Sequence, residues 1–173
     1  MPQPRLVAIV GKKNAGKTTL AVALVRDLVR RGHRVMTIKH GTHPFEMDQQ
    51  GRDTWRHMHE GGAERVLMEG PGSRVLIATT DAEEHPRDLA NRFLGDAHFV
   101  VVEGFEKSDL PKIEVYRRAV DASPLWAPGA PGADSYLAIV TDASDFRAPV
   151  PVLRFNDTNW LYRLVDLVLQ GAR

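Results

Sequence analysis

The sequence predicts an α/β fold, a mainly parallel, twisted sheet with flanking helices. Two unbroken apolar runs, residues 6–10 and 99–102, have the pattern of central strands buried on both faces. Between them, residues 18–31 place leucine and valine at helical spacing, and Gly32 follows as a possible cap. Because strands and helices alternate along the chain, the strands are expected to run parallel, with helices crossing between them.

The same patterns predict the remaining elements. Two runs joined by a Gly- and Pro-containing turn, residues 65–68 and 74–80, predict a hairpin that forms an antiparallel edge of the sheet. Residues 86–94 are expected to be helical, and residues 158–169 to form a closing amphipathic helix with Asp157 as its cap. The other expected strands are residues 34–39, 112–116, 137–140 and 151–155.

The length of the chain predicts its domain organisation. With 173 residues and 43% apolar content, the chain is long enough for one packed domain and short for two. A single domain over residues 1–173 is therefore expected. Residues 121–135 are rich in Pro, Gly and Ala, a composition that favours a long mobile loop.

The composition of the chain indicates which kinds of partner it binds and in which cellular compartment it works. Lys and Arg total 23 against 22 Asp and Glu, so the net charge of +1 indicates neither nucleic acid nor a membrane surface as a partner. No apolar run approaches the about 20 residues that a membrane-spanning helix needs, and the first residues lack a signal-peptide pattern. The chain has no cysteine, which excludes disulfides and thiolate metal sites and fits a reducing cytosol. We therefore expect a cytoplasmic protein.

The strongest chemical signal is a match to G-x-x-x-x-G-K-[ST] between the first expected strand and the first expected helix. The two glycines let the backbone curl so that successive N–H groups converge on phosphate oxygens, and the helix adds its positive N-terminus. Lys17 is expected to reach the β- and γ-phosphates, Thr18 to bind Mg²⁺ and Thr19 to hydrogen-bond the α-phosphate. The sequence thus predicts a P-loop NTPase domain with these nucleotide-binding residues: Gly11, Lys12, Lys13, Asn14, Ala15, Gly16, Lys17, Thr18 and Thr19.

A P-loop protein also needs acids at the same edge of the sheet, to bind Mg²⁺ and to orient water. Glu103 ends the second apolar run and is followed by glycine, which is where a Walker B acid is placed. The segment after the strand at residues 34–39 emerges at this edge, so Asp48 and Asp53 are further candidates. We expect the metal ligands to come from Thr18, Asp48, Asp53 and Glu103, and the catalytic residues to be Glu103 and Asp48.

Histidines in the same region leave a transition-metal site open as an alternative. His40 and His43, together with Asp48, would offer two nitrogens and an oxygen, as zinc sites do. His57 and His59 are two apart on an expected helix and therefore face different directions. Structural or anion-contacting histidines are favoured, and the loop from residue 38 to 54 is interpreted first as a switch that senses the nucleotide.

Four segments together resemble the MobB family of molybdopterin-guanine dinucleotide biosynthesis adapter proteins. They are GKKNAGKTTL, TIKHGTHPFEMDQQGRDTWRHMHEGGAE, VVVEGFEKSDLPKIEVYR and IVTD, and the similarity spans nearly the whole chain. The second and third segments are the specific ones, since the P-loop is generic. The family usually has Asp-His-His before the Phe of the second segment, whereas this chain departs from that pattern, which weakens the case for a shared metal site.

The resemblance implies a P-loop GTPase-like fold, a homodimer, and binding of GTP with Mg²⁺ followed by slow hydrolysis. It also implies a partner, the MobA-like guanylyltransferase, which the adapter would help to attach GMP to molybdopterin. Contact with molybdopterin itself is possible in this scheme.

Recognition of guanine is the least determined feature, because N-K-x-D, the usual guanine-reading motif, does not occur in the sequence. Asp142 follows an expected strand at a suitable stage of the fold, so its carboxylate is a candidate to accept from guanine. The alternative is that Asp142 only caps the following turn.

Three functions stay open when the residues and the family resemblance are taken together. The first is the GTP-dependent adapter. The second is a small-molecule kinase, in which Asp48 or Glu103 would act as base towards an acceptor hydroxyl. The third is a metallochaperone GTPase, if the histidines bind metal.

Overall fold

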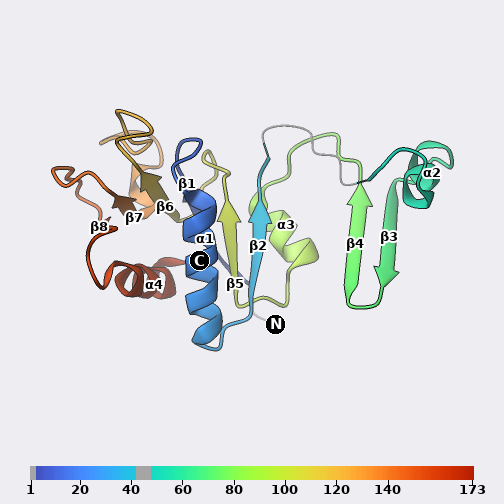
Figure 1. Cartoon of the computed structure of the whole chain (residues 1–173), viewed down its shortest axis with the longest axis horizontal. Helices are drawn as coiled ribbons and strands as arrows, with labels where there is room; N and C mark the ends of the chain where they lie inside the picture. Colours follow the sequence, from blue (N-terminus) through green and yellow to red (C-terminus); the bar gives the residue numbers. More distant parts are fainter. Residues whose placement is uncertain (1–2, 42–47) are drawn as a thin grey trace. The chain divides into compact units, whose positions relative to one another are not determined.

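The computed structural model describes residues 3–41 and 48–173, which form two sheets and their connecting helices (Figure 1). In chain order the elements are β1 (Arg5–Val10), α1 (Lys17–Arg30), β2 (Val35–Lys39), α2 (Asp53–His59), β3 (Arg65–Gly70), β4 (Ser73–Ala78), α3 (Pro86–Phe93), β5 (Phe99–Glu103), β6 (Lys112–Tyr116), the 3-10 turn η1 (Ala133–Ser135), β7 (Tyr136–Thr141), β8 (Val152–Arg154) and α4 (Trp160–Gly171).

The main sheet has six strands in the order β2-β5-β1-β6-β7-β8. Every pairing within it is parallel, as the arrows of β2 and β5 in Figure 1 illustrate. The expected fold class, a mainly parallel sheet with flanking helices and a small antiparallel pair, is confirmed. Since all six strands run the same way, their carboxyl ends meet at one edge, which is where ligands bind in such sheets.

The central strand β1 divides its side chains between two apolar clusters. Val7 and Ile9 pack with α1 and α4 on one face. Leu6, Ala8 and Val10 pack with α3 on the other. None of the five is more than 1% exposed. Because alternate residues of a strand point to opposite faces, burial on both sides explains why this run contains no polar residue.

Helix α1 ends as the sequence indicates, whereas α4 does not begin as expected. Gly32 has φ +84°, its N–H donates to the Val29 carbonyl and that of His33 donates to the Leu28 carbonyl, the pattern of a Schellman motif. At α4 the N-cap residue is Asn159, which makes no side-chain capping bond. The cap expected at Asp157 is therefore wrong: its carbonyl instead accepts the Trp160 N–H within the turn that precedes the helix.

The chain divides into two compact units, residues 1–40 with 85–173, and residues 41–84. The first unit contains the six-stranded sheet. The single domain expected over residues 1–173 stays a prediction. Across the described ranges, 3–41 and 48–173, no helix is long and apolar enough to cross a membrane.

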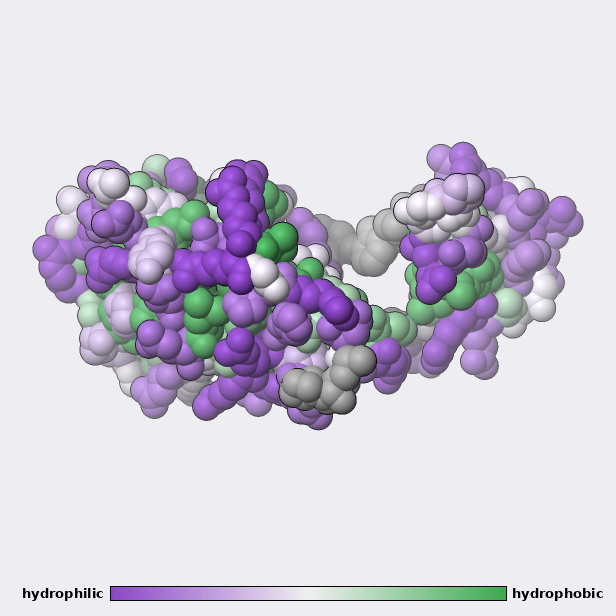
Figure 2. Space-filling view, turned by 90° about the horizontal axis from the view of Figure 1, so that it is seen from below, coloured by the Kyte–Doolittle hydropathy of each residue, from purple (hydrophilic) through white to green (hydrophobic). Residues whose placement is uncertain are grey.

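The second unit contains the expected hairpin, in which β3 pairs with β4 from Arg65↔Ala78 to Gly70↔Ser73. It forms a two-stranded sheet of its own and does not extend the edge of the main sheet, which ends at β2 and β8. Its hydrophobic side chains reach the surface, as Figure 2 shows for this unit, and Leu67 is 60% exposed. The two runs and the short turn between them predicted the hairpin correctly, but not the sheet to which the hairpin belongs.

Candidate nucleotide-binding site

The loop between β1 and α1 has the backbone geometry that the glycine spacing predicts. Gly11, Asn14 and Gly16 have φ angles of +146°, +65° and +102°. A β-carbon at Gly11 would lie 2.5 Å from the carbonyl oxygen of Val115 on β6, so a side chain has no room there. Helix α1 then starts with no side-chain capping bond and no acidic residue in its first turn. Its first N–H groups therefore form an anion-binding end.

Lys17 folds back over this loop. Its Nζ donates to the carbonyl oxygens of Gly11 and Lys12, both at 2.9 Å. The ammonium group is thereby held against the curled backbone, where it adds positive charge to that of the helix terminus. Lys12 and Lys13 are exposed on the same loop, whereas Ala15 is buried beneath it.

Thr18 and Glu103 come together although they are far apart in the sequence. The Thr18 hydroxyl donates to the Glu103 carboxylate, at 2.9 Å from Oε1 and 3.0 Å from Oε2. Lys39 at the end of β2 places its Nζ 3.2 Å from Oε1 of the same carboxylate. Hydroxyl and carboxylate oxygens are the ligands that Mg²⁺ prefers, so this pair has the donor set for the ion. The next residue along from Thr18, Thr19, is exposed at the start of α1.

The turn after Glu103 is also shaped by close packing. Gly104 has φ +99°, and a β-carbon there would lie 2.9 Å from Cβ of His40. The His40 ring packs against the ring of Phe105, with 4.5 Å between their centroids. His40 thus takes part in the packing of the edge of the sheet, which fits the structural interpretation of this histidine.

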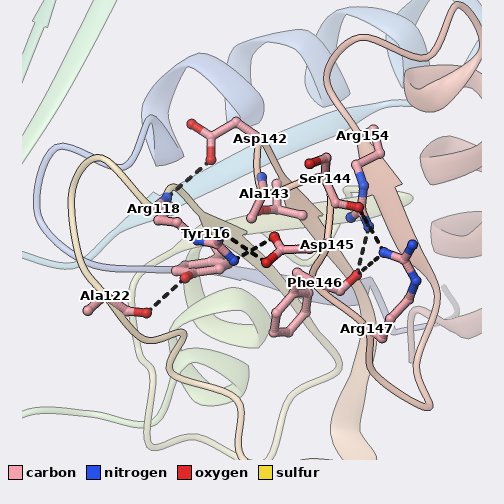
Figure 3. A network of polar contacts seen from close by, with 11 residues as sticks. Tyr116, Arg118, Ala122, Asp142, Ala143, Ser144, Asp145, Phe146, Arg147 and Arg154 are labelled. Atoms are coloured by element: carbon pink, nitrogen blue, oxygen red, sulfur yellow. Dashed lines mark hydrogen bonds and ion pairs between the residues drawn. The ribbon is translucent and has the colours of Figure 1, made fainter.

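Asp142 lies exposed immediately after β7. Its Oδ1 accepts a hydrogen bond from the backbone N–H of Arg118, at 3.1 Å, and the Arg118 guanidinium pairs with Asp145 at 2.7 Å (Figure 3). The carboxylate thus connects the loop after β7 to the loop after β6. Its part in guanine recognition stays a prediction.

Asp48 and Asp53 belong to the unit of residues 41–84. Asp48 Oδ1 accepts from the Gln49 N–H and from the Thr54 hydroxyl, both at 2.9 Å, so it organises the start of α2. Asp53 is exposed in the first turn of that helix, where a negative charge is favourable. Their assignment as Mg²⁺ ligands, and that of Asp48 in catalysis, stay predictions.

The histidines differ in their surroundings. His59 stacks on Trp55, with 4.3 Å between the ring centroids, while His57 is exposed. His43 lies outside the described residues. Among the residues that are described, no group of three or more His, Cys, Asp or Glu side chains is arranged to bind a metal ion.

Residues 6–142 match the family model described as MobB, Molybdopterin guanine dinucleotide synthesis protein B. This chain belongs to the MobB family. The resemblance seen in the sequence is confirmed.

Relatives and solved structures agree with this assignment. A Haemophilus influenzae protein named molybdopterin-guanine dinucleotide biosynthesis adapter protein is 35% identical over 141 residues, 79% of this chain and 74% of that protein. An Escherichia coli protein of the same name is 31% identical over 114 residues, 65% of each chain. The crystal structure of Bacillus subtilis MobB aligns over 98% of both chains with a TM-score of 0.66 at 21% identity, which shows the shared fold.

In this MobB-family chain, sequence reasoning missed a pair of buried charged residues on β6. Glu114 is 1% exposed, and its carboxylate accepts the backbone N–H groups of Leu125 at 2.6 Å and of Trp126 at 3.0 Å. Lys112 is 3% exposed and donates to the Ser108 carbonyl at 2.6 Å and to the Ser135 hydroxyl at 3.0 Å. Both charges therefore hold the irregular segment between β6 and β7 against the sheet.

The electrostatics of these two residues follow from their burial. Burial raises the pKa of the Glu114 carboxyl, and the two backbone N–H groups act in the opposite direction. Burial lowers the pKa of Lys112. The sequence did contain a signal for this pair. Strands covered by helices on both faces are usually continuous apolar runs, whereas residues 112–116, Lys-Ile-Glu-Val-Tyr, alternate polar and apolar side chains, which indicates that one face of the strand has polar partners.

Proposed function

We propose that this chain is a cytoplasmic GTP-binding adapter with weak GTPase activity. It would assist a MobA-like guanylyltransferase in attaching GMP to molybdopterin during molybdenum cofactor biosynthesis. The observation that carries the nucleotide part is the arrangement of Lys17, Thr18 and Glu103 around the curled loop. The role in cofactor biosynthesis rests on family membership and on the names of the relatives.

In this proposal each group has a separate task. The loop and the first N–H groups of α1 bind the phosphates, and Lys17 leaves its two carbonyl acceptors to contact the terminal phosphates. Thr18 and Glu103 would hold Mg²⁺, which neutralises phosphate charge when it is bound. Glu103, with Asp48, would orient the attacking water, and Asp142 would accept from guanine. Slow hydrolysis suits an adapter, because the bound state must last long enough for the partner to detect it.

The proposal also includes a homodimer, the commonest arrangement for a soluble oligomer. The hairpin has exposed hydrophobic side chains, among them Leu67, Met68 and Leu76, and such a surface supports association with another protein chain. Sedimentation equilibrium would give twice the monomer mass of 19.3 kDa for a dimer.

Calorimetric titration of GTP and of ATP, with Mg²⁺, tests the nucleotide part. The wild-type chain should bind GTP in preference to ATP, and Lys17→Ala should weaken GTP binding roughly 10- to 100-fold, because a charge-assisted contact to phosphate is lost. Asp142→Ala should reduce the preference for GTP over ATP by a similar factor, with little loss in phosphate binding.

Other outcomes would point elsewhere. Preference for ATP would favour a small-molecule kinase, and histidine-dependent metal binding of defined stoichiometry would favour a metallochaperone GTPase. If neither nucleotide binds, the P-loop assignment itself is wrong. A pull-down of purified guanylyltransferase with and without GTP tests the partner separately.

A further inference from the structure

Arg117 lies beside the P-loop, and we expected no role for it from the sequence, although it is the last residue of the family-like segment VVVEGFEKSDLPKIEVYR. It directly follows β6, the strand that pairs with β1 through Val10↔Glu114. A β-carbon built on Gly16 would lie 3.9 Å from Nε of Arg117. The guanidinium group therefore borders the space beside Gly16, the residue at which the loop turns into helix α1.

The Arg117 side chain also lies over an aromatic ring. Its guanidinium carbon lies 4.7 Å from the centroid of the Phe155 ring, directly after β8. Within residues 3–41 and 48–173, no carboxylate forms an ion pair with it, whereas its neighbour Arg118 pairs with Asp145. A planar guanidinium stacked on an aromatic ring keeps its N–H donors in one orientation, so less entropy is lost when an anion binds.

The strand order determines which part of a nucleotide Arg117 would meet. In the sheet, β5 with Glu103 lies on one side of β1, and β6, which leads into Arg117, lies on the other (Figure 1). The Thr18–Glu103 pair marks the side of Mg²⁺ and the terminal phosphates. Asp142 follows β7, the next strand beyond β6. Arg117 thus stands between the phosphate loop and the candidate base-reading residue.

We propose that Arg117 is a nucleotide ligand that donates to the phosphate nearest the ribose. This inference rests on the proposed function, because it requires a nucleotide in the P-loop. The role differs from that of an arginine that stabilises the γ-phosphate during hydrolysis: Arg117 would contribute equally to GTP and GDP binding, and would not distinguish the two.

The test is calorimetric titration of GTP and GDP into Arg117→Ala, Arg117→Lys and a control, Arg26→Ala. Arg26 is an exposed arginine on α1, so its replacement removes the same charge away from the loop. Arg117→Ala should weaken GTP and GDP binding by the same factor, roughly 10- to 100-fold. Arg117→Lys should recover part of the loss, and Arg26→Ala should stay within about twofold of wild type.

A further variant, Phe155→Leu, tests the stacking platform. It should weaken both nucleotides less than Arg117→Ala does, and the double variant should be no weaker than Arg117→Ala alone, since both changes act through one contact. Thermal unfolding of each variant shows whether the fold is intact. If Arg117→Ala does not fold, the comparison of Arg117→Lys and Phe155→Leu with wild type decides the question.

Three results would overturn the inference. Unchanged binding in Arg117→Ala would remove the residue from the site. Loss of GTP binding with GDP binding unchanged would assign Arg117 to the γ-phosphate. An equal loss in the control Arg26→Ala would show that only the overall positive charge matters and that Arg117 makes no direct contact with the nucleotide. Lys17→Ala distinguishes failure of this inference from failure of the proposed function. If Lys17→Ala also leaves GTP binding unchanged, the proposed function is wrong, and not only the role of Arg117.

Discussion

Gly11 and Gly104 are glycines for reasons that lie outside their own segments. A β-carbon at Gly11 would meet the backbone of Val115 at 2.5 Å, and one at Gly104 would meet His40 at 2.9 Å. Both close approaches occur where the strands of the main sheet end. The close packing of backbone at this edge of the sheet thus excludes side chains at the two positions.

The buried carboxyl of Glu114 makes a residue-scale prediction about pH. Because its pKa is raised by burial, the folded chain binds more protons than the unfolded chain between the ordinary value of 4.5 and the raised value. Stability is therefore highest below that window and falls as the pH rises through it. Relative to Glu114→Gln, which carries no charge, the wild-type chain should lose stability over this range, as measured by thermal unfolding at a series of pH values.

The Glu114→Gln substitution should also lower the free energy of unfolding by an amount that does not depend on pH. It keeps one acceptor oxygen for the Leu125 and Trp126 N–H groups, so it should be less stable than wild type by about 1 kcal/mol in acid. If instead the stability of the wild-type chain increases relative to that of Glu114→Gln as the pH rises, the pKa of Glu114 is lowered, and the backbone N–H groups outweigh burial.

At the scale of elements, the connection between β6 and β7, residues 117–135, contains no α-helix, and it covers part of the sheet as a helix would. It covers Tyr116 of β6 and Ile139 of β7 with Trp126, which is 8% exposed. The hydroxyl of Tyr116 donates to the Ala122 carbonyl in the same segment, at 3.0 Å. Backbone that forms neither helix nor sheet needs other partners, and the Glu114 carboxylate supplies them for the N–H groups of Leu125 and Trp126, while Lys112 donates to the Ser135 hydroxyl at the end of the segment. Whether the rest of the segment is mobile, as its composition predicts, stays a prediction.

Trp126 is the apolar anchor of this segment, and Trp126→Ala should lower the free energy of unfolding by about 3 kcal/mol. Urea denaturation measures the change. Among the described residues its indole Nε1 has no hydrogen-bond partner, so Trp126→Phe should cost clearly less, since it keeps a ring and removes an unpaired donor. Val120→Ala, at a position that is 39% exposed, is the control and should stay within about 0.5 kcal/mol of wild type. A loss no larger than that of the control would show that the segment does not depend on the tryptophan.

At the scale of the molecule, the two units differ in how much apolar surface they bury. The strands β1 and β5 are buried along almost their whole length, whereas Val66 is the one buried hydrophobic residue among those described between 41 and 84. A two-stranded hairpin without a core opens readily. Backbone amides of β3 and β4 should therefore exchange with solvent faster than those of β1 and β5 by at least about tenfold.

Hydrogen exchange followed by mass spectrometry of peptides checks this difference. Measurement at low and high protein concentration distinguishes intrinsic protection from association, because a second copy would protect the exposed hydrophobic face of the hairpin only when concentrated. Equal protection of both units at low concentration would contradict the prediction.

The sequence by itself determined the parallel α/β fold, the curled glycine-containing loop between β1 and α1, and the family. These features follow from local patterns: apolar runs whose length and period reflect burial, helical spacing up to Gly32, and a motif whose glycines can adopt the positive φ angles that the loop needs. Such patterns act over a few residues, so they also placed most elements within one or two residues of their observed bounds.

Only the tertiary structure decided which distant groups meet. Thr18 and Glu103 are 85 positions apart, and no local signal predicts their contact, which exists because β5 inserts beside β1 in the sheet. The same holds for Lys39 beside Glu103, for Arg117 beside Gly16, and for the hairpin that forms its own sheet. Strand order and the packing of connections depend on the free energy of the whole chain, and a local pattern of burial is compatible with several such arrangements.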